Sequence, residues 1–278
     1  MFKARKKALS PIWLSAFFLG LSSAFSPFVW ADVQCPPPND AIAATVAYVD
    51  DGDTVRLTNG DRVRLAGIDA PEVAHPAYSD RPARPSEPFG DASKQALLSL
   101  LAGSHNRLRV QYGAEPEDRY GRKLAYLYLP DGRSIQGTLV AKGLAMAVFM
   151  PPNLALADCL TSIEKTARER HVGIWSNREY DPGISTAEGI PGDVQGAAII
   201  SGRVLSVHRS RSAVWINLEG RVALQIPERA WDQFHGIDFD DWKGRVLRAR
   251  GWLVHDKNRY QDWRMPIESL RSIELLTR

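Results

Sequence analysis

The chain has 278 residues, of which 44% are hydrophobic and 24% are charged, with 35 Lys and Arg against 32 Asp and Glu. A chain with this apolar content and both charge signs can bury a sizeable core, which excludes an intrinsically disordered protein and a collagen-like repeat. Its two cysteines exclude a disulfide-dense miniprotein. We therefore expect a folded protein.

The first 31 residues predict an export signal. Basic residues within positions 3–7 precede an apolar run over 12–25, and small residues near Ala31 offer a cleavage point. The apolar run is shorter than the roughly 20 residues of a membrane span, although an uncleaved anchor is the alternative. We expect an exported chain, periplasmic or secreted, without stable membrane association after cleavage. Its oligomeric state is left open.

The rest of the chain predicts two domains. A segment rich in Gly and Pro over 181–196 indicates a linker between a first domain at 32–180 and a second at 197–278. Each domain contains its own set of short alternating runs, which are typical of strands. In an oxidising compartment Cys35 and Cys159 could pair or remain separate thiols.

The first domain predicts a small barrel with three helices packed around it, hence a mainly β fold with α elements. Asn59-Gly60 marks a tight hairpin. We expect strands at 45–49, 54–58, 62–68, 107–112, 123–129 and 144–149, and helices at 91–102, 134–142 and 154–171.

The second domain predicts five strands and one short helix around 228–234. This content fits a second, small OB-like barrel, and other five-stranded arrangements fit equally well. We expect its strands at 198–208, 213–219, 221–226, 245–254 and 272–276.

Two segments of the first domain bring acidic residues to one hairpin. Asp50-Asp51-Gly52-Asp53-Thr54 enters a strand, and the returning strand runs from Arg64 to Asp69-Ala70-Pro71-Glu72. If Asn59 and Gly60 are the two turn residues, Asp53 lies opposite Ala66 and shares a face with Arg64. Asp69 then falls on the other face, unless a bulge or the strand end re-aims it.

This grouping has a functional and a structural interpretation. Two aspartates, a backbone carbonyl and waters are suitable ligands for a hard cation such as Ca²⁺. Alternatively, Asp-Gly is ordinary turn chemistry, and Asp69-x-x-Glu72 is also a helix capping pattern. Both interpretations stay open on these residues alone.

A third motif, Asp118-Arg119-Tyr120-Gly121-Arg122, is a turn that leads into a predicted strand. The planar guanidinium of Arg122 matches phosphate oxygens, so a second arginine would complete a phosphate clamp. The alternative is a solvated arginine after a turn glycine. The six histidines show no close ligand spacing, which argues against a zinc site.

Taken together, these three motifs resemble those of the staphylococcal nuclease-like thermonucleases, and the resemblance covers about residues 44–178. Lys142-Gly143-Leu144-Ala145 and Gly173-Ile174-Trp175-Ser176 look like the later signatures of that family. The resemblance implies an OB-fold five-stranded barrel with packed helices. It also implies an endonuclease, a hydrolase of phosphodiester bonds that depends on Ca²⁺ and takes DNA and RNA as substrates.

The resemblance also implies roles for individual residues. Asp53 and Asp69 would ligate Ca²⁺ together with the carbonyl of Ala70. Glu72 would activate the attacking water. Arg64 and Arg122 would hold the phosphate, and Tyr120 would contact the substrate.

The chain departs from the family where a pair of tyrosines usually packs on the nucleotide. It has Ala147-Val148-Phe149-Met150-Pro151 there, so both hydroxyls are missing. Phe149 either stacks on a base of the substrate or is a core aromatic. The proline-rich segment 73–89 is also longer than the usual loop beside the site.

Two segments of the second domain, 206–211 and 245–250, mix basic and apolar residues, and tryptophans at 215, 242, 252 and 263 are interleaved with them. This pattern is typical of a nucleic-acid-binding surface or of a solvated sheet face. The leading hypothesis is an exported, Ca²⁺-dependent nuclease with an OB-like accessory domain. Its alternative is a catalytically weak or inactive OB-fold protein that only binds nucleic acid. A third hypothesis is a structural interaction module that binds no metal.

Overall fold

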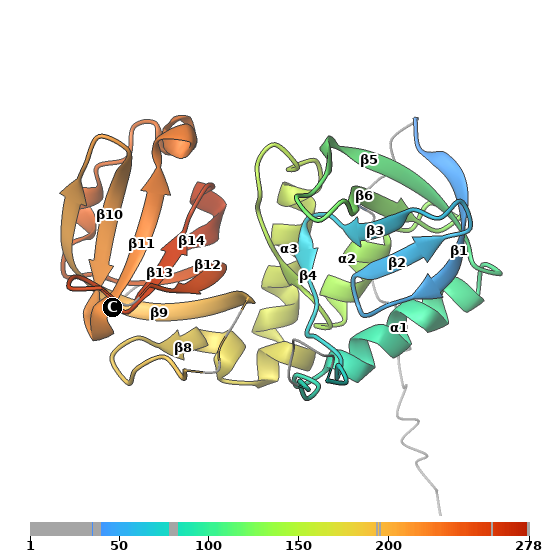
Figure 1. Ribbon diagram of the computed structural model, residues 1–278, viewed down its shortest axis with the longest axis horizontal. Helices are drawn as coiled ribbons and strands as arrows, with labels where there is room; N and C mark the ends of the chain where they lie inside the picture. Colours follow the sequence, from blue (N-terminus) through green and yellow to red (C-terminus); the bar gives the residue numbers. More distant parts are fainter. Residues whose placement is uncertain are drawn as a thin grey trace, which may run out of the picture. The chain divides into compact units, whose positions relative to one another are not determined.

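The computed structural model describes residue 35 and residues 40–77, 83–192, 194, 196–256 and 258–276 (Figure 1). The predicted export signal and its cleavage point lie outside these residues. Within the described chain, no helix combines the length and the apolarity needed to cross a bilayer. All described residues belong to one compact unit.

The first set of strands closes into a five-stranded barrel. Its strands follow the order β1 (Ile42–Val49), β2 (Thr54–Leu57), β3 (Arg62–Leu65), β6 (Lys123–Tyr128) and β5 (Arg107–Glu117). The β3–β6 pair is parallel and the other pairs are antiparallel. Side chains alternate between a buried interior and an outer face, as expected of a small barrel. The predicted OB-fold barrel is confirmed.

The β2–β3 hairpin is longer by one residue than the sequence predicted. The Leu57 amide donates to the Asp61 carbonyl (2.9 Å), which leaves residues 58–60 as a three-residue loop. Gly60 has φ +94°, as the last residue of such a loop often requires. The predicted two-residue turn is therefore wrong, and each cross-strand partner shifts by one position.

Three helices pack around this barrel, as predicted. They are α1 (Gly90–Ala102), α2 (Ile135–Ala141) and α3 (Ala157–Glu169). The Ser134 hydroxyl caps α2 by accepting the Gly137 amide at 3.1 Å. A two-residue pairing joins β4 (Ile68–Asp69) to β7 (Met146–Ala147). This pairing replaces the longer strand predicted at 144–149.

A disulfide joins Cys35 to Cys159, so the pairing that the sequence allowed is present. Cys35 is fully buried and belongs to the core of the first barrel. The bridge ties the segment ahead of β1 to α3, across a sequence separation of 124 residues.

The second set of strands closes in the same order. The circuit runs β9 (Gly196–Arg209), β10 (Ala213–Leu218), β11 (Val222–Pro227), β13 (Trp263–Pro266) and β12 (Val246–His255), and β12 pairs back onto β9. The β11–β13 pair is parallel, like β3–β6. The predicted OB-like second barrel is confirmed.

The strands of this second barrel differ from the prediction in one respect. The strand predicted at 272–276 is β14 (Ile273–Leu275), which pairs with β12 outside the closed circuit. The barrel is closed instead by β13, which the sequence analysis missed.

The segment predicted as a linker, 181–196, also carries structure. It contributes β8 (Ile184–Ser185), which pairs with β9. Short helical turns complete the described chain: η1 (Gly173–Ser176), η2 (Glu179–Gly183), η3 (Glu219–Arg221), η4 (Glu228–Phe234), η5 (Phe239–Trp242) and η6 (Leu270–Ser272).

Candidate active site

The acidic turn ahead of β2 packs directly on α1. A Cβ atom on Gly52 would lie 2.6 Å from the Cβ of Ser93 and 2.8 Å from that of Ala70, so only glycine fits. The Asp53 amide donates to Asp51 Oδ1 (3.0 Å). This packing holds the Asp53 side chain at the start of the strand.

The pairing of Asp53 differs from the prediction. The Leu65 amide donates to the Asp53 carbonyl at 2.8 Å, so Asp53 lies beside Leu65 and not opposite Ala66. Strict alternation would then separate Asp53 from Arg64. Asp53 precedes the first residue of β2, however, and its side chain is free of that alternation.

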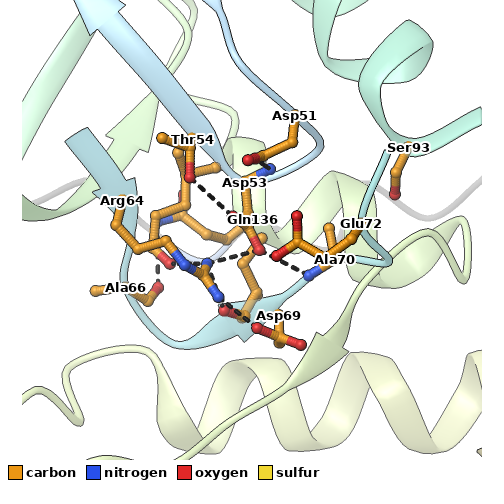
Figure 2. A network of polar contacts seen from close by, with 12 residues as sticks. Asp51, Asp53, Thr54, Arg64, Ala66, Asp69, Ala70, Glu72, Ser93 and Gln136 are labelled. Atoms are coloured by element: carbon orange, nitrogen blue, oxygen red, sulfur yellow. Dashed lines mark hydrogen bonds and ion pairs between the residues drawn. The ribbon is translucent and has the colours of Figure 1, made fainter. Parts of the chain in front are cut away.

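Arg64 reaches between the two predicted ligands, as Figure 2 shows. Its Nη1 lies 2.7 Å from Asp53 Oδ2, and its Nη2 lies 2.5 Å from Asp69 Oδ1. Asp69 arrives here because β3 ends at Leu65 and the chain turns at Gly67, which has φ +83°. The end of the strand thus re-aims Asp69, one of the two outcomes that the sequence left open.

Ala70 completes this cluster through its backbone. Its amide donates to Asp53 Oδ2 at 2.7 Å. No described residue donates a hydrogen bond to its carbonyl oxygen. The carbonyl therefore remains available as a ligand.

The cluster carries more negative than positive charge. Burial raises the pKa of Asp53 well above its usual range, Arg64 opposes this, and Asp51 and Asp69 raise it further. Burial likewise raises the pKa of Asp69 to about 6 against the opposing effect of Arg64. Burial alone would lower the pKa of Arg64, but the carboxylates raise it overall. The single positive charge of the Arg64 guanidinium does not offset the negative charges of the buried carboxylates around it.

This donor set suits a hard divalent cation. It offers carboxylate oxygens and a free backbone carbonyl, and it has a charge deficit that a cation would offset. In the described part of the chain, no three His, Cys, Asp or Glu side chains form a ready-made metal site. A cation here would take its remaining ligands from the backbone and from water.

Glu72 is held by its backbone and leaves its carboxylate accessible. Its amide donates to Glu87 Oε2 (3.1 Å), and its carbonyl accepts the Glu87 amide (2.9 Å). Gly90 packs against the same carbonyl, since a Cβ there would lie 2.2 Å from it. The Glu72 side chain is 44% exposed, with His75 Nε2 at 3.4 Å. It is therefore free to contact water and substrate.

Arg122 comes from the strand next to Arg64. β3 and β6 pair with Arg64 beside Leu124, and Arg122 immediately precedes β6. Its Nε binds Asp118 Oδ2 at 2.7 Å. Among the described residues no ion pair joins it to the Asp53 cluster. Arg122 also lies over the ring of Tyr120, which is 66% exposed and open to a ligand.

Phe149 does not offer a stacking surface as it lies in the structure. It is 6% exposed and belongs to the core of the first barrel. The guanidinium of Arg250 lies 5.8 Å from its ring centroid. Burial thus favours the core interpretation of this aromatic.

Gln136, which was not predicted from the sequence, is fully buried beside the cluster (Figure 2). Its side chain accepts the Leu127 amide (3.1 Å) and donates to the carbonyls of Ala66 (3.3 Å) and Ala125 (3.1 Å). It thereby ties the end of β3 to β6. A single glutamine in an apolar helix gave no signal of this role.

Two arginines of the second domain do not form the basic surface that their alternation suggested. Arg248 and Arg250 are 4% and 9% exposed. Arg250 forms an ion pair with the buried Glu164 of α3 at 2.5 Å, and Arg248 binds Asp181 at 2.6 Å and Glu274 at 2.5 Å. Both guanidinium groups are engaged within the protein.

Comparison with known proteins gives several relatives. A family model described as staphylococcal nuclease homologue matches residues 62–177, which include every candidate residue except Asp53. A thermonuclease of Staphylococcus intermedius is 35% identical over 133 residues, which are 47% of this chain and 74% of the relative.

Two further relatives cover a similar share of this chain. A thermonuclease of Staphylococcus hyicus is 32% identical over 48% of this chain and 75% of the relative. Endonuclease YncB of Bacillus subtilis (strain 168) is 33% identical over 47% of this chain and 60% of the relative. The chain belongs to the staphylococcal nuclease-like family.

Proposed function

We propose that this protein is an exported, Ca²⁺-dependent nuclease that hydrolyses phosphodiester bonds of DNA and RNA. Its enzyme class, a hydrolase of the endonuclease type, follows from the family. The position of Arg64 supports the assigned site most strongly. Its guanidinium lies 2.7 Å from Asp53 and 2.5 Å from Asp69, beside the free carbonyl of Ala70.

Asp53, Asp69 and the Ala70 carbonyl would hold the cation. A bound Ca²⁺ supplies positive charge that stabilises the negative charge developing on phosphate oxygens. Arg64 is already oriented by two carboxylates and by the Ile68 carbonyl at 3.0 Å. A phosphate would share its guanidinium donors with these groups, at little further cost in side-chain freedom. Its fork of donors matches the phosphate oxygens.

Glu72 is proposed as the general base, because its carboxylate is accessible while its backbone is fixed by Glu87. It would accept a proton from the attacking water as the water oxygen bonds to phosphorus. The P–O bond to the leaving nucleoside would break in the same displacement, and the leaving oxygen would take a proton from solvent water. Arg122 would stabilise the phosphate from the neighbouring strand. The exposed ring of Tyr120 would contact the substrate.

The alternative function is nucleic-acid binding with weak or no catalysis. It is motivated by the absence of the tyrosine pair and by the burial of Phe149. This alternative predicts substrate affinity without turnover, whereas the nuclease predicts both.

The test is hydrolysis of single-stranded DNA and RNA by the purified mature chain, with Ca²⁺ or with chelator. We expect Ca²⁺-dependent cleavage, and we expect Glu72→Gln and Arg122→Ala each to lower kcat by about 10²-fold or more. Matched controls are Glu115→Gln and Arg107→Ala, which change exposed residues on β5. A folded wild-type protein that binds both polymers but cleaves neither would establish the binding alternative.

A further inference from the structure

Three exposed residues on the outer face of β1–β3 and a half-buried lysine of α1 form a cluster next to the acidic turn. Tyr48 on β1, Arg56 on β2, Arg62 on β3 and Lys94 on α1 are called here the outer patch. Tyr48 is 57% exposed, and the side chains of Arg56 and Arg62 are 57% and 47% exposed. The proposed catalytic roles use none of the four.

Strand pairing places the outer patch on the same face as Arg64. Arg56 pairs with Arg62, and Thr54 pairs with Arg64. Arg62 and Arg64 are two residues apart on β3, so their side chains leave the same face about 6.6 Å apart. This separation is comparable to the distance between successive phosphates of an extended single strand.

One carboxylate orients both arginines. Asp50, whose side chain is 10% exposed, accepts Arg56 Nε at 2.9 Å and Arg62 Nε at 2.7 Å. Each arginine is bound through Nε, so its terminal nitrogens remain unbonded to any described residue. Two guanidinium groups against one carboxylate leave a net positive charge. Asp50 therefore holds two preorganised groups that can bind an anion.

Tyr48 adds an aromatic face to this charge. The β1 strand is irregular between Val46 and Tyr48, which places Tyr48 opposite Arg56. Arg56 and Lys94 lie 5.9 and 5.6 Å from its ring centroid. The Lys94 ammonium donates to the Asp50 carbonyl at 2.9 Å, which fixes it beside the ring. An exposed ring next to cations is the arrangement that binds stacked bases of single strands.

We propose that the outer patch is a second substrate subsite, where Arg56 and Arg62 bind the phosphate next to the cleaved one and Tyr48 stacks on a base. The inference rests on the proposed function, because it takes the cleaved phosphate to lie at Arg64. The ligand is a single-stranded nucleic acid that is longer than one phosphodiester unit.

The test compares a single-stranded oligonucleotide with bis(4-nitrophenyl) phosphate, which has one phosphodiester and no neighbouring phosphate. For Arg56→Gln/Arg62→Gln we expect the oligonucleotide KM to rise about 10-fold, with kcat nearly unchanged. The slope of log KM against log salt should fall by about 0.7 for each lost phosphate contact. Tyr48→Ala should raise KM by about 5-fold or more without altering that slope.

The single-phosphodiester substrate should be cleaved equally by the wild type and the outer-patch variants. The matched control Arg107→Gln/Arg211→Gln removes two exposed arginines elsewhere and should leave the oligonucleotide KM unchanged. The subsite would be overturned if the outer-patch variants impaired cleavage of both substrates equally. It would also be overturned if the control variant raised the oligonucleotide KM as much as they do.

If the protein is not a nuclease, the experiment gives a result that can be told apart from failure of the subsite. In that case the wild type cleaves neither substrate, and the readout becomes oligonucleotide affinity by fluorescence anisotropy. Weaker binding by the outer-patch variants than by the control supports the subsite even then, and equal binding overturns it.

Discussion

Asp69 makes stability depend on pH, because its pKa is about 6 in the folded protein against an ordinary 3.8. Burial causes this rise, so the folded state binds the Asp69 proton more tightly than the unfolded chain does. Between these two values the folded state carries more protons, and the free energy of unfolding therefore falls as pH rises. We expect this fall in chelator-treated protein, measured by urea denaturation from pH 4 to pH 7.

Asp69→Asn should make the slope over that pH range shallower, because the titrating group is gone. The control Asp91→Asn changes an exposed aspartate of α1 and should keep the wild-type slope. If Asp69→Asn shows the same slope as the wild type, Asp69 does not cause the pH dependence.

The turn at Gly52 is an element whose placement depends on one missing Cβ. In Gly52→Ala the new atom would meet Ser93 and Ala70, so the turn must move away from α1 and take Asp53 with it. We expect the free energy of unfolding to fall by about 1–3 kcal/mol. We also expect the rise in Tm caused by Ca²⁺ to become smaller, as measured by thermal denaturation with and without the ion.

The hairpin glycine gives a contrasting control. Gly60→Ala strains a residue at φ +94° but meets no atom within 4 Å. It should lower Tm while preserving the full effect of Ca²⁺. A Gly52→Ala protein that keeps the wild-type response to Ca²⁺ would show that the turn does not position the cation ligands.

Elements were predictable from sequence where the signal is local. The strands and helices of the first barrel follow from alternation and end signals. The contact of Arg64 with Asp53 and Asp69 does not, because Asp53 precedes β2 and Asp69 follows the end of β3. The register was not predictable, because two- and three-residue loops both suit Asn59-Gly60. The choice between them depends on backbone torsions that the residue types leave open.

Contacts between residues that are distant in the sequence explain the other features that were not predicted. β13 has four residues, ends in Pro266, and is a strand because it pairs with the distant β11. Likewise, the alternation around Arg250 looks the same on a solvated sheet face as on a buried one. Only the fold brings Glu164 to that arginine.

At the scale of the whole molecule, the Arg250–Glu164 pair joins the second barrel to the first. Arg250 also donates to the Ala147 carbonyl at 2.9 Å, and Glu164 accepts the Ala147 amide at 2.6 Å. Ala147 is in β7, whose partner β4 carries Asp69. The pair therefore stabilises the strand beside the candidate site.

Arg250→Met should lower the free energy of unfolding by about 3–5 kcal/mol, because it leaves the 3%-exposed Glu164 without its ion pair. Adding Glu164→Gln should recover part of this loss, since the amide is neutral and can still accept the Ala147 N–H. Chemical denaturation of the two single variants and the double variant measures the coupling.

A surface ion pair provides a reference for the loss of stability expected in Arg250→Met. Arg229→Met removes the partner of Glu268 on the surface and should cost at most about 1 kcal/mol. Equal losses for Arg229→Met and Arg250→Met would show that the link between the barrels contributes no more than a surface ion pair.

The disulfide constrains how the chain reaches this fold. The chain has two cysteines, so a single molecule has one possible bridge and oxidation cannot trap it as a mispaired isomer. Cys159 follows all five strands of the first barrel, so Cys35 has no partner until the sequence of that barrel has been synthesised. Incorrect disulfides can therefore form only between two molecules of the chain. Their frequency should depend on protein concentration during refolding.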